Sequence, residues 1–90
     1  MGLFSRKKPK VDLDALFKEK YKDLNQIAMQ AQQEHDYIVK ESLLKLVCER
    51  YDELLKLIDE GAHFDEIHFM NLQQHAREEY DIVHNINVGE

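Results

Sequence analysis

Apolar residues recur every three or four positions along most of the chain, which is the spacing of one face of an α-helix. The widest such face lies in residues 42–61, where apolar side chains cover roughly 200° of the helical circumference. Because a helix packed on one neighbour needs an apolar arc of only about 100°, we expect two neighbours around this stretch. They are either two helices of the same chain or one helix and a second copy. Ser42 is a candidate N-cap of this helix, and Gly61 suits the position just after its end.

A narrower apolar stripe precedes the central stretch and predicts a first helix that begins at Asp12 or Asp14. The stripe consists of Leu13, Leu16, Phe17, Tyr21, Leu24, Ile27, Ala28, Ala31, His35 and Ile38. The apolar face then changes phase between residues 36 and 43, a segment without Gly or Pro. Two interpretations stay open. Either the chain turns there, with Asp36 or Ser42 as the next N-cap, or one continuous helix offers different faces to different partners.

A third stripe follows Gly61 after a short connection, and Asp65 is a candidate N-cap for it. Its apolar members are Phe69, Leu72, Ala76, Tyr80, Val83 and Ile86, and the helix is expected to end near Asn85 or Asn87. The three stripes predict an all-α fold with coiled-coil-like packing. It is either a three-helix antiparallel bundle or a long helical hairpin with a third helix. Residues 1–10 are expected to be a flexible basic tail, and residues 11–88 a single helical domain.

Composition supports one small globular domain. Ninety residues allow one domain at most, and an apolar content of 43% is normal for a chain that folds. The single cysteine, Cys48, cannot form an intramolecular disulfide, and its place in the central apolar arc indicates a small buried hydrophobic residue. No apolar run approaches the ~18 residues of a membrane span. We therefore expect a cytoplasmic protein, with the inner face of the membrane as an alternative location.

Charge is distributed unevenly along the chain. The net charge of −6 combines four positive charges in residues 1–10 with an excess of ten negative charges in residues 11–90. Because an acidic body repels phosphate backbones, binding of nucleic acid is not expected. The basic cluster follows two apolar residues, which makes the segment a candidate for weak contact with a membrane surface. The candidate membrane-surface residues are Leu3, Phe4, Arg6, Lys7, Lys8 and Lys10.

The opening hexapeptide MGLFSR resembles the first residues of the phage-shock membrane-binding family. The resemblance covers these six residues, and no function is carried over from it. The N-myristoylation pattern is not met, because Arg6 stands where Ser or Thr is required.

Five histidines raise the question of a metal site. Two Asp-x-x-His pairs occur, Asp65 with His68 and Asp81 with His84. The pairs lie 16 residues apart on one predicted helix, which separates them by roughly 24 Å, too far for one dinuclear site. Cys48 has no matched base or acid that would indicate a catalytic site. We therefore expect no catalytic residue, no cofactor and no metal.

The first functional hypothesis is a small acidic helical protein–protein interaction or regulatory module without catalytic activity. Its partner is expected to be another protein or a second copy of the chain in a homodimer. The candidate partner-binding residues are Tyr37, Val39, Leu43, Leu46, Leu57, His68 and His75. Met29 and Met70 are also expected to be exposed. The alternatives are a peripheral membrane-surface protein tethered by its N-terminal segment and a small metal-binding helical protein.

Overall fold

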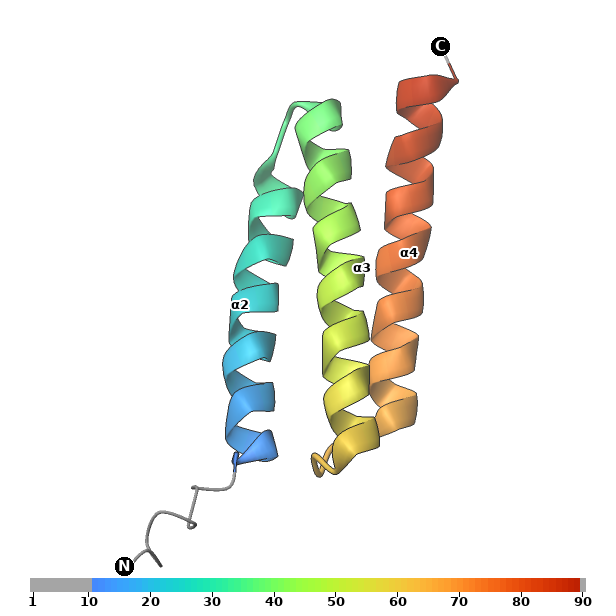
Figure 1. Cartoon of the computed structure of the whole chain (residues 1–90). Helices are drawn as coiled ribbons and strands as arrows, with labels where there is room; N and C mark the ends of the chain where they lie inside the picture. The colour runs from blue at the N-terminus through green and yellow to red at the C-terminus, as the bar shows by residue number, and fades with distance from the viewer. Residues whose placement is uncertain (1–10, 90) are drawn as a thin grey trace, which may run out of the picture.

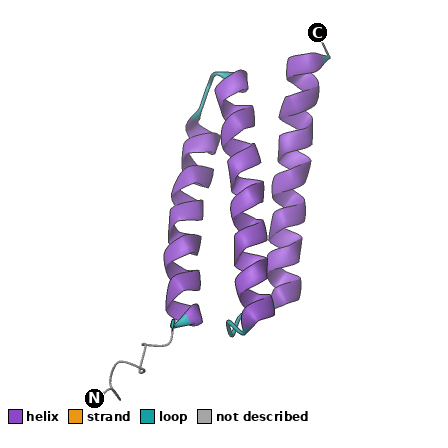
Figure 2. Cartoon of the chain, viewed as in Figure 1, coloured by secondary structure: helices purple, strands orange, loops and turns teal. Residues whose placement is uncertain are grey.

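The computed structural model describes residues 11–89, which form three α-helices joined by two short turns (Figure 1). Helix α2 spans Leu13–Gln33, α3 spans Tyr37–Glu60 and α4 spans Glu66–Val88. The described residues contain no strand (Figure 2). The predicted all-α three-helix bundle is confirmed. The predicted flexible tail lies outside the described residues, as do the six candidate membrane-surface residues.

Helix α3 is the middle helix of the bundle. It runs antiparallel to both α2 and α4 and packs against each of them, which accounts for the width of its apolar face (Figure 1). The three large side chains with almost no exposure are Leu54 of α3 and Phe17 and Leu24 of α2. The predicted covering of this helix by two neighbours is confirmed, and both neighbours belong to the same chain.

Each helix begins at an aspartate whose side chain accepts a backbone hydrogen bond from the first turn. Asp12 accepts from the N–H of Ala15, and Asp65 accepts from the N–H of His68. Asp36 accepts from the N–H of Ile38 at 2.9 Å and begins α3. These carboxylates satisfy N–H groups that have no partner within the helix.

The continuous helix considered for residues 36–43 is wrong, because the chain turns at Glu34–Asp36. The interpretation of Ser42 as an N-cap is also wrong, since Ser42 lies inside α3 and its hydroxyl donates to the Ile38 carbonyl at 3.4 Å. The turn forms without Gly or Pro. Instead, the Lys40 ammonium group donates to the carbonyl of Ala31 at 2.7 Å, so the last turn of α2 has a cationic partner.

Gly61 ends α3 in a conformation that favours glycine. Its φ is 128°, and its N–H donates to the carbonyl of Ile58. The N–H of Ala62 donates to the carbonyl of Leu57 at 2.9 Å. This pair of bonds is a Schellman motif, which satisfies the final carbonyls of the helix.

Aromatic side chains join α2 and α4 near the α3–α4 turn. Phe17 meets Phe69 edge-on with ring centroids 4.9 Å apart, and Tyr21 meets the same ring at 5.2 Å. Phe64 of the turn stacks on Phe17 at 4.0 Å. Edge-to-face and stacked arrangements of this kind add to the stabilisation that burial of the rings already provides.

Candidate functional site

One end of the bundle has two helices where the rest has three. Helix α2 ends at Gln33, while α3 begins and α4 ends further along the bundle axis (Figure 1). Ala31, in the last turn of α2, packs against Leu44 and Val83. Beyond that level, the side-chain amide of Asn87 donates to the carbonyl of Tyr37 at 2.9 Å, so α3 and α4 continue to contact each other alone. We call this end of the molecule the tip.

The missing third helix leaves an apolar groove between α3 and α4 at the tip. Its lining residues, which define the tip groove, are Tyr37, Lys40, Leu44, Glu79, Ile82, Val83 and Ile86. Leu44 and Val83 are buried beneath it. Tyr37, Ile82 and Ile86 remain 47%, 61% and 42% exposed. Exposed apolar side chains scattered singly are normal on a protein surface, whereas a group around a groove marks a contact site.

Polar contacts hold the two helices of the tip together on the side away from the groove. The Nδ1 atom of His84 lies 2.9 Å from Oε2 of Glu41, and the side-chain amide of Asn87 donates to Oε1 of Glu41 at 2.7 Å. The hydrogen bond from Asn87, followed by the one from His84, lowers the pKa of the Glu41 carboxyl below its ordinary value. Tyr80 stacks on the His84 ring with centroids 5.6 Å apart. These contacts fix the walls of the tip groove before any partner binds.

The structure distributes the predicted partner-binding residues over several surfaces. Tyr37 lines the tip groove, whereas Val39 is exposed but does not line it. Leu43 and Leu46 are half-buried, with Leu43 packed beside the Ala31, Leu44 and Val83 cluster. Leu57 is only 7% exposed and belongs to the core, so its side chain is not available to a partner.

His68 and His75 lie exposed on α4, and neither lines the tip groove. The His68 ring meets the edge of Phe69, with centroids 5.2 Å apart, and so borders the aromatic cluster. The exposure expected for Met29 and Met70 is confirmed.

Sequence reasoning missed the two isoleucines of the groove. Ile86 belongs to the apolar stripe of α4 and was expected in the core, but it is exposed because α2 has already ended at its level. Ile82 stands outside the stripe, one helical turn before Ile86. An isolated isoleucine on the polar side of a helix, one turn from a stripe residue, is the signal that points to this surface.

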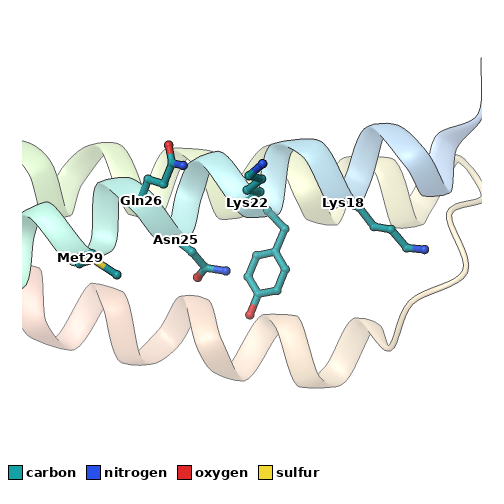
Figure 3. Close-up of a pocket in the computed structure, with 6 residues that line it drawn as sticks. Lys18, Lys22, Asn25, Gln26 and Met29 are labelled. Carbon is teal, nitrogen blue, oxygen red and sulfur yellow. The ribbon is translucent and has the colours of Figure 1, made fainter.

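A second depression lies along the side of α2. Its lining residues are Lys18, Tyr21, Lys22, Asn25, Gln26 and Met29. In Figure 3, Asn25 and Met29 extend toward α4, whereas Lys22 and Gln26 point away from it. All of these residues except Tyr21 are exposed. The depression is therefore an open, mixed polar surface with no buried polar group to orient a ligand.

The Asp-x-x-His pairs have structural roles. Asp65 accepts the backbone N–H of His68 as a helix cap, and the ring of His84 contacts Glu41 of another helix. Within residues 11–89, no group of three or more His, Cys, Asp or Glu side chains could hold a metal ion. Burial raises the pKa of the Cys48 thiol, which favours the unreactive protonated form.

Asp14 and His63 join the start of α2 to the α3–α4 turn. The backbone N–H of His63 donates to Oδ1 of Asp14 at 2.8 Å, and its ring Nδ1 lies 3.1 Å from Oδ2. The backbone hydrogen bond, followed by the contact with the ring, lowers the pKa of the Asp14 carboxyl. This pair therefore holds the turn in place at the end opposite the tip.

The chain matches no protein-family model, no curated protein and no solved structure. No helix among the described residues is long and apolar enough to cross a membrane. The tip groove combines exposed apolar side chains with a buried apolar floor.

Proposed function

We propose that this chain is a small acidic helical protein–protein interaction or regulatory module without catalytic activity, and that the tip groove is its contact surface. The supporting observation is that Tyr37, Ile82 and Ile86 are exposed around one groove above a buried floor. A groove between two helices suits an amphipathic helix, which places its apolar face between them. Tyr37 supplies an aromatic anchor of the kind that is enriched in binding hot spots.

The energetics favour association at this surface. Burying an exposed isoleucine contributes about 1.5–3 kcal/mol when the whole side chain leaves water. The groove walls are held by the Glu41 contacts to His84 and Asn87, so little ordering of the helices is needed on binding. A small apolar contact with ordered walls is typical of a weak, reversible interaction.

Site-specific photo-crosslinking in the cells from which the sequence comes tests the proposal. A photoreactive amino acid replaces Ile86 in one variant and Glu78 in a matched control. Both positions are exposed on α4, but only Ile86 lines the tip groove. We expect protein adducts from position 86 that are absent or much fainter from position 78. Equal adducts at both positions, or none at either, would contradict the proposed function.

A second candidate function, contact with a membrane surface from the cytoplasm, is supported by the charge asymmetry. Four basic residues in the first ten precede residues 11–89, which hold seventeen acidic and eight basic side chains. Basic residues near anionic lipid contribute about 1 kcal/mol each, whereas the acidic body is repelled. Co-sedimentation with phosphatidylserine vesicles of the whole chain and of a chain without residues 1–10 tests this function. Equal pelleting of the two removes it.

A further inference from the structure

The α3–α4 pair carries the tip groove. It also carries an apolar ridge, made by Ile82 and Ile86, that could fill such a groove. Ile82 and Ile86 project one turn apart from α4, beside a floor made by Leu44 and Val83. A surface that carries both halves of a complementary contact can pair with itself across a two-fold axis. We infer that the occupant of the tip groove is a second copy of this chain, an inference that rests on the proposed function.

The charges at the rim of the groove are self-complementary. Lys40 of α3 and Glu79 of α4 both line it. Lys40 uses one of its three N–H donors on the Ala31 carbonyl, and Glu79 uses one oxygen on the side-chain amide of Gln32. Each side chain therefore keeps capacity for a partner. Two-fold pairing brings Lys40 of each protomer to the partner's Glu79, so opposite charges meet twice.

Three other acidic side chains at the tip, Glu34, Asp36 and Glu41, are engaged within their own chain. Glu34 accepts the backbone N–H of Asp36 at 3.0 Å, and Asp36 accepts that of Ile38. Glu41 accepts from Asn87. Because these carboxylates already have hydrogen-bond partners, they add less repulsion to the approach of a second tip than unpaired carboxylates would.

The opposite end of the bundle carries a concentration of acid that orients such a pair. The acidic residues in the first turns of α2 and α4, at their caps and in the last turn of α3 are Asp12, Asp14, Asp59, Glu60, Asp65 and Glu66. Like charges repel, and salt screens the repulsion only beyond about 8–10 Å. A tip-to-tip arrangement places the two acid-rich ends as far apart as the molecules allow. Within residues 11–89, a side-by-side or head-to-tail arrangement brings at least one acid-rich end against another acidic surface, which only the four basic residues of the N-terminal segment joined to that end would offset.

The length of chain between the apolar residues of the N-terminal segment and Val11 is shorter than the distance from Val11 to the tip groove of the same molecule. Leu3 and Phe4 join the bundle through Val11, at the end of α2 opposite the tip (Figure 1). Fully extended, the seven residue steps from Phe4 to Val11, or the eight from Leu3, span about 23–29 Å. The 21-residue α2 that separates Val11 from the tip is about 32 Å long. The occupant is therefore a second molecule.

Sedimentation equilibrium of the full chain over a wide concentration range measures the self-association. We expect the apparent mass to rise from 10.7 kDa toward twice that value. Ile82→Gln should weaken dimerisation at least tenfold, since the change removes apolar contact from both sides of the two-fold axis. Ile67→Gln is the matched control. Ile67 lies on the same helix and is 65% exposed, but it is far from the tip groove, so the dissociation constant should stay the same.

Charge reversal tests the two-fold geometry directly. Lys40→Glu and Glu79→Lys should each weaken self-association, because like charges then meet across the axis. An equimolar mixture of the two variants should associate as tightly as the parent, since every rim contact in the mixed dimer joins opposite charges again. Circular dichroism shows whether each variant keeps its helices. Recovery in the mixture is itself a sign that both variants are folded.

The outcomes separate this inference from the proposed function. A chain that stays at 10.7 kDa at all concentrations overturns the second-copy inference. A dimer whose dissociation constant is unchanged by Ile82→Gln and by both charge reversals overturns it as well. If position 86 then cross-links to a different protein, the proposed function stands with another partner. If position 86 gives no specific adduct, the proposed function fails as well.

Discussion

His84 Nδ1 lies 2.9 Å from Oε2 of Glu41, and this contact joins the end of α4 to the second turn of α3. Asn87 occupies the other carboxylate oxygen at 2.7 Å. Both hydrogen-bond partners of this carboxylate therefore come from a helix that is distant in sequence. The hydrogen bond from Asn87, followed by the one from His84, lowers the pKa of Glu41 below its ordinary 4.5, and this has a consequence for stability.

Acid is expected to destabilise the fold through this group. Because the pKa of Glu41 is lower in the folded chain than in the unfolded one, the unfolded chain binds the proton more readily. The contribution of Glu41 is therefore complete above about pH 4.5 and is lost as pH falls through the folded pKa. The pKa of Asp14 is also lowered, from an ordinary 3.8, so its contribution to stability is likewise lost as the pH falls below that value. Thermal melts followed by circular dichroism should show a melting temperature that decreases as the pH is lowered below 4.5. In Glu41→Gln this decrease should be smaller. An identical pH profile in that variant would refute the role of Glu41.

Loss of the Asp36 cap should destabilise the chain by about 0.5–2 kcal/mol in the substitution Asp36→Ala. The carboxylate accepts the backbone N–H groups of Ile38 and Val39, which have no other partner in the helix. Asp59→Ala is the control at the other end of α3, where an acidic residue opposes the helix dipole and its removal should be neutral or slightly stabilising. Urea denaturation measures both changes. Equal losses in the two variants would argue against the cap.

Truncation of the fully buried Leu54 should have the largest effect on stability. Leu54→Ala removes a side chain with 0% exposure from the middle helix, and such changes cost about 2–5 kcal/mol. Leu55→Ala, one position along and half-buried, should cost clearly less. The free energy of unfolding from denaturant titration decides between them. A larger loss at position 55 would show that the core is placed wrongly.

Gly61→Ala should destabilise by about 1–2 kcal/mol because its φ of 128° is unfavourable for a residue with a Cβ atom. Space is not the cause, since the added Cβ would lie 3.5 Å from Cδ1 of Leu13, an ordinary contact. Asn adopts left-handed backbone conformations more readily than Ala, so Gly61→Asn should lose less stability. Thermal melts of the two variants give the comparison. Equal stability of Gly61→Ala and the parent would show that the turn relaxes without cost.

The sequence pattern predicts the helices and their order because each depends on neighbours three or four residues away. The wide arc through Leu44 and Leu54 correctly indicates a middle helix with two neighbours. The pattern does not decide the turn at Glu34–Asp36, because its stabilising contact, from Lys40 to the Ala31 carbonyl, joins two helices and has no local signature. Asp36 was recognised as a candidate cap, but only the structure selects it over Ser42.

The tip groove could not be predicted from the sequence, because it results from a difference in where helices end. Ile86 continues the apolar stripe of α4 and looks like a core residue until the level of Gln33 is known. His84 shows the same limit. Its spacing from Asp81 indicates a local pair, whereas its partner is Glu41, 43 residues away in sequence. Local periodicity identifies which face is apolar, and the register between helices decides which part of that face stays uncovered.

The position of α3 between its two neighbours in sequence also determines how the chain folds. Helix α2 precedes it across a turn of three residues, and α4 follows it across a connection of five. Both helix pairs that pack along their lengths are therefore hairpins of adjacent segments, which gives the fold a low contact order. Such helical topologies fold in microseconds to milliseconds, because little loop entropy is lost before the first contacts form. Either hairpin can serve as the nucleus, and the remaining helix then docks onto a face of α3 that is already in place.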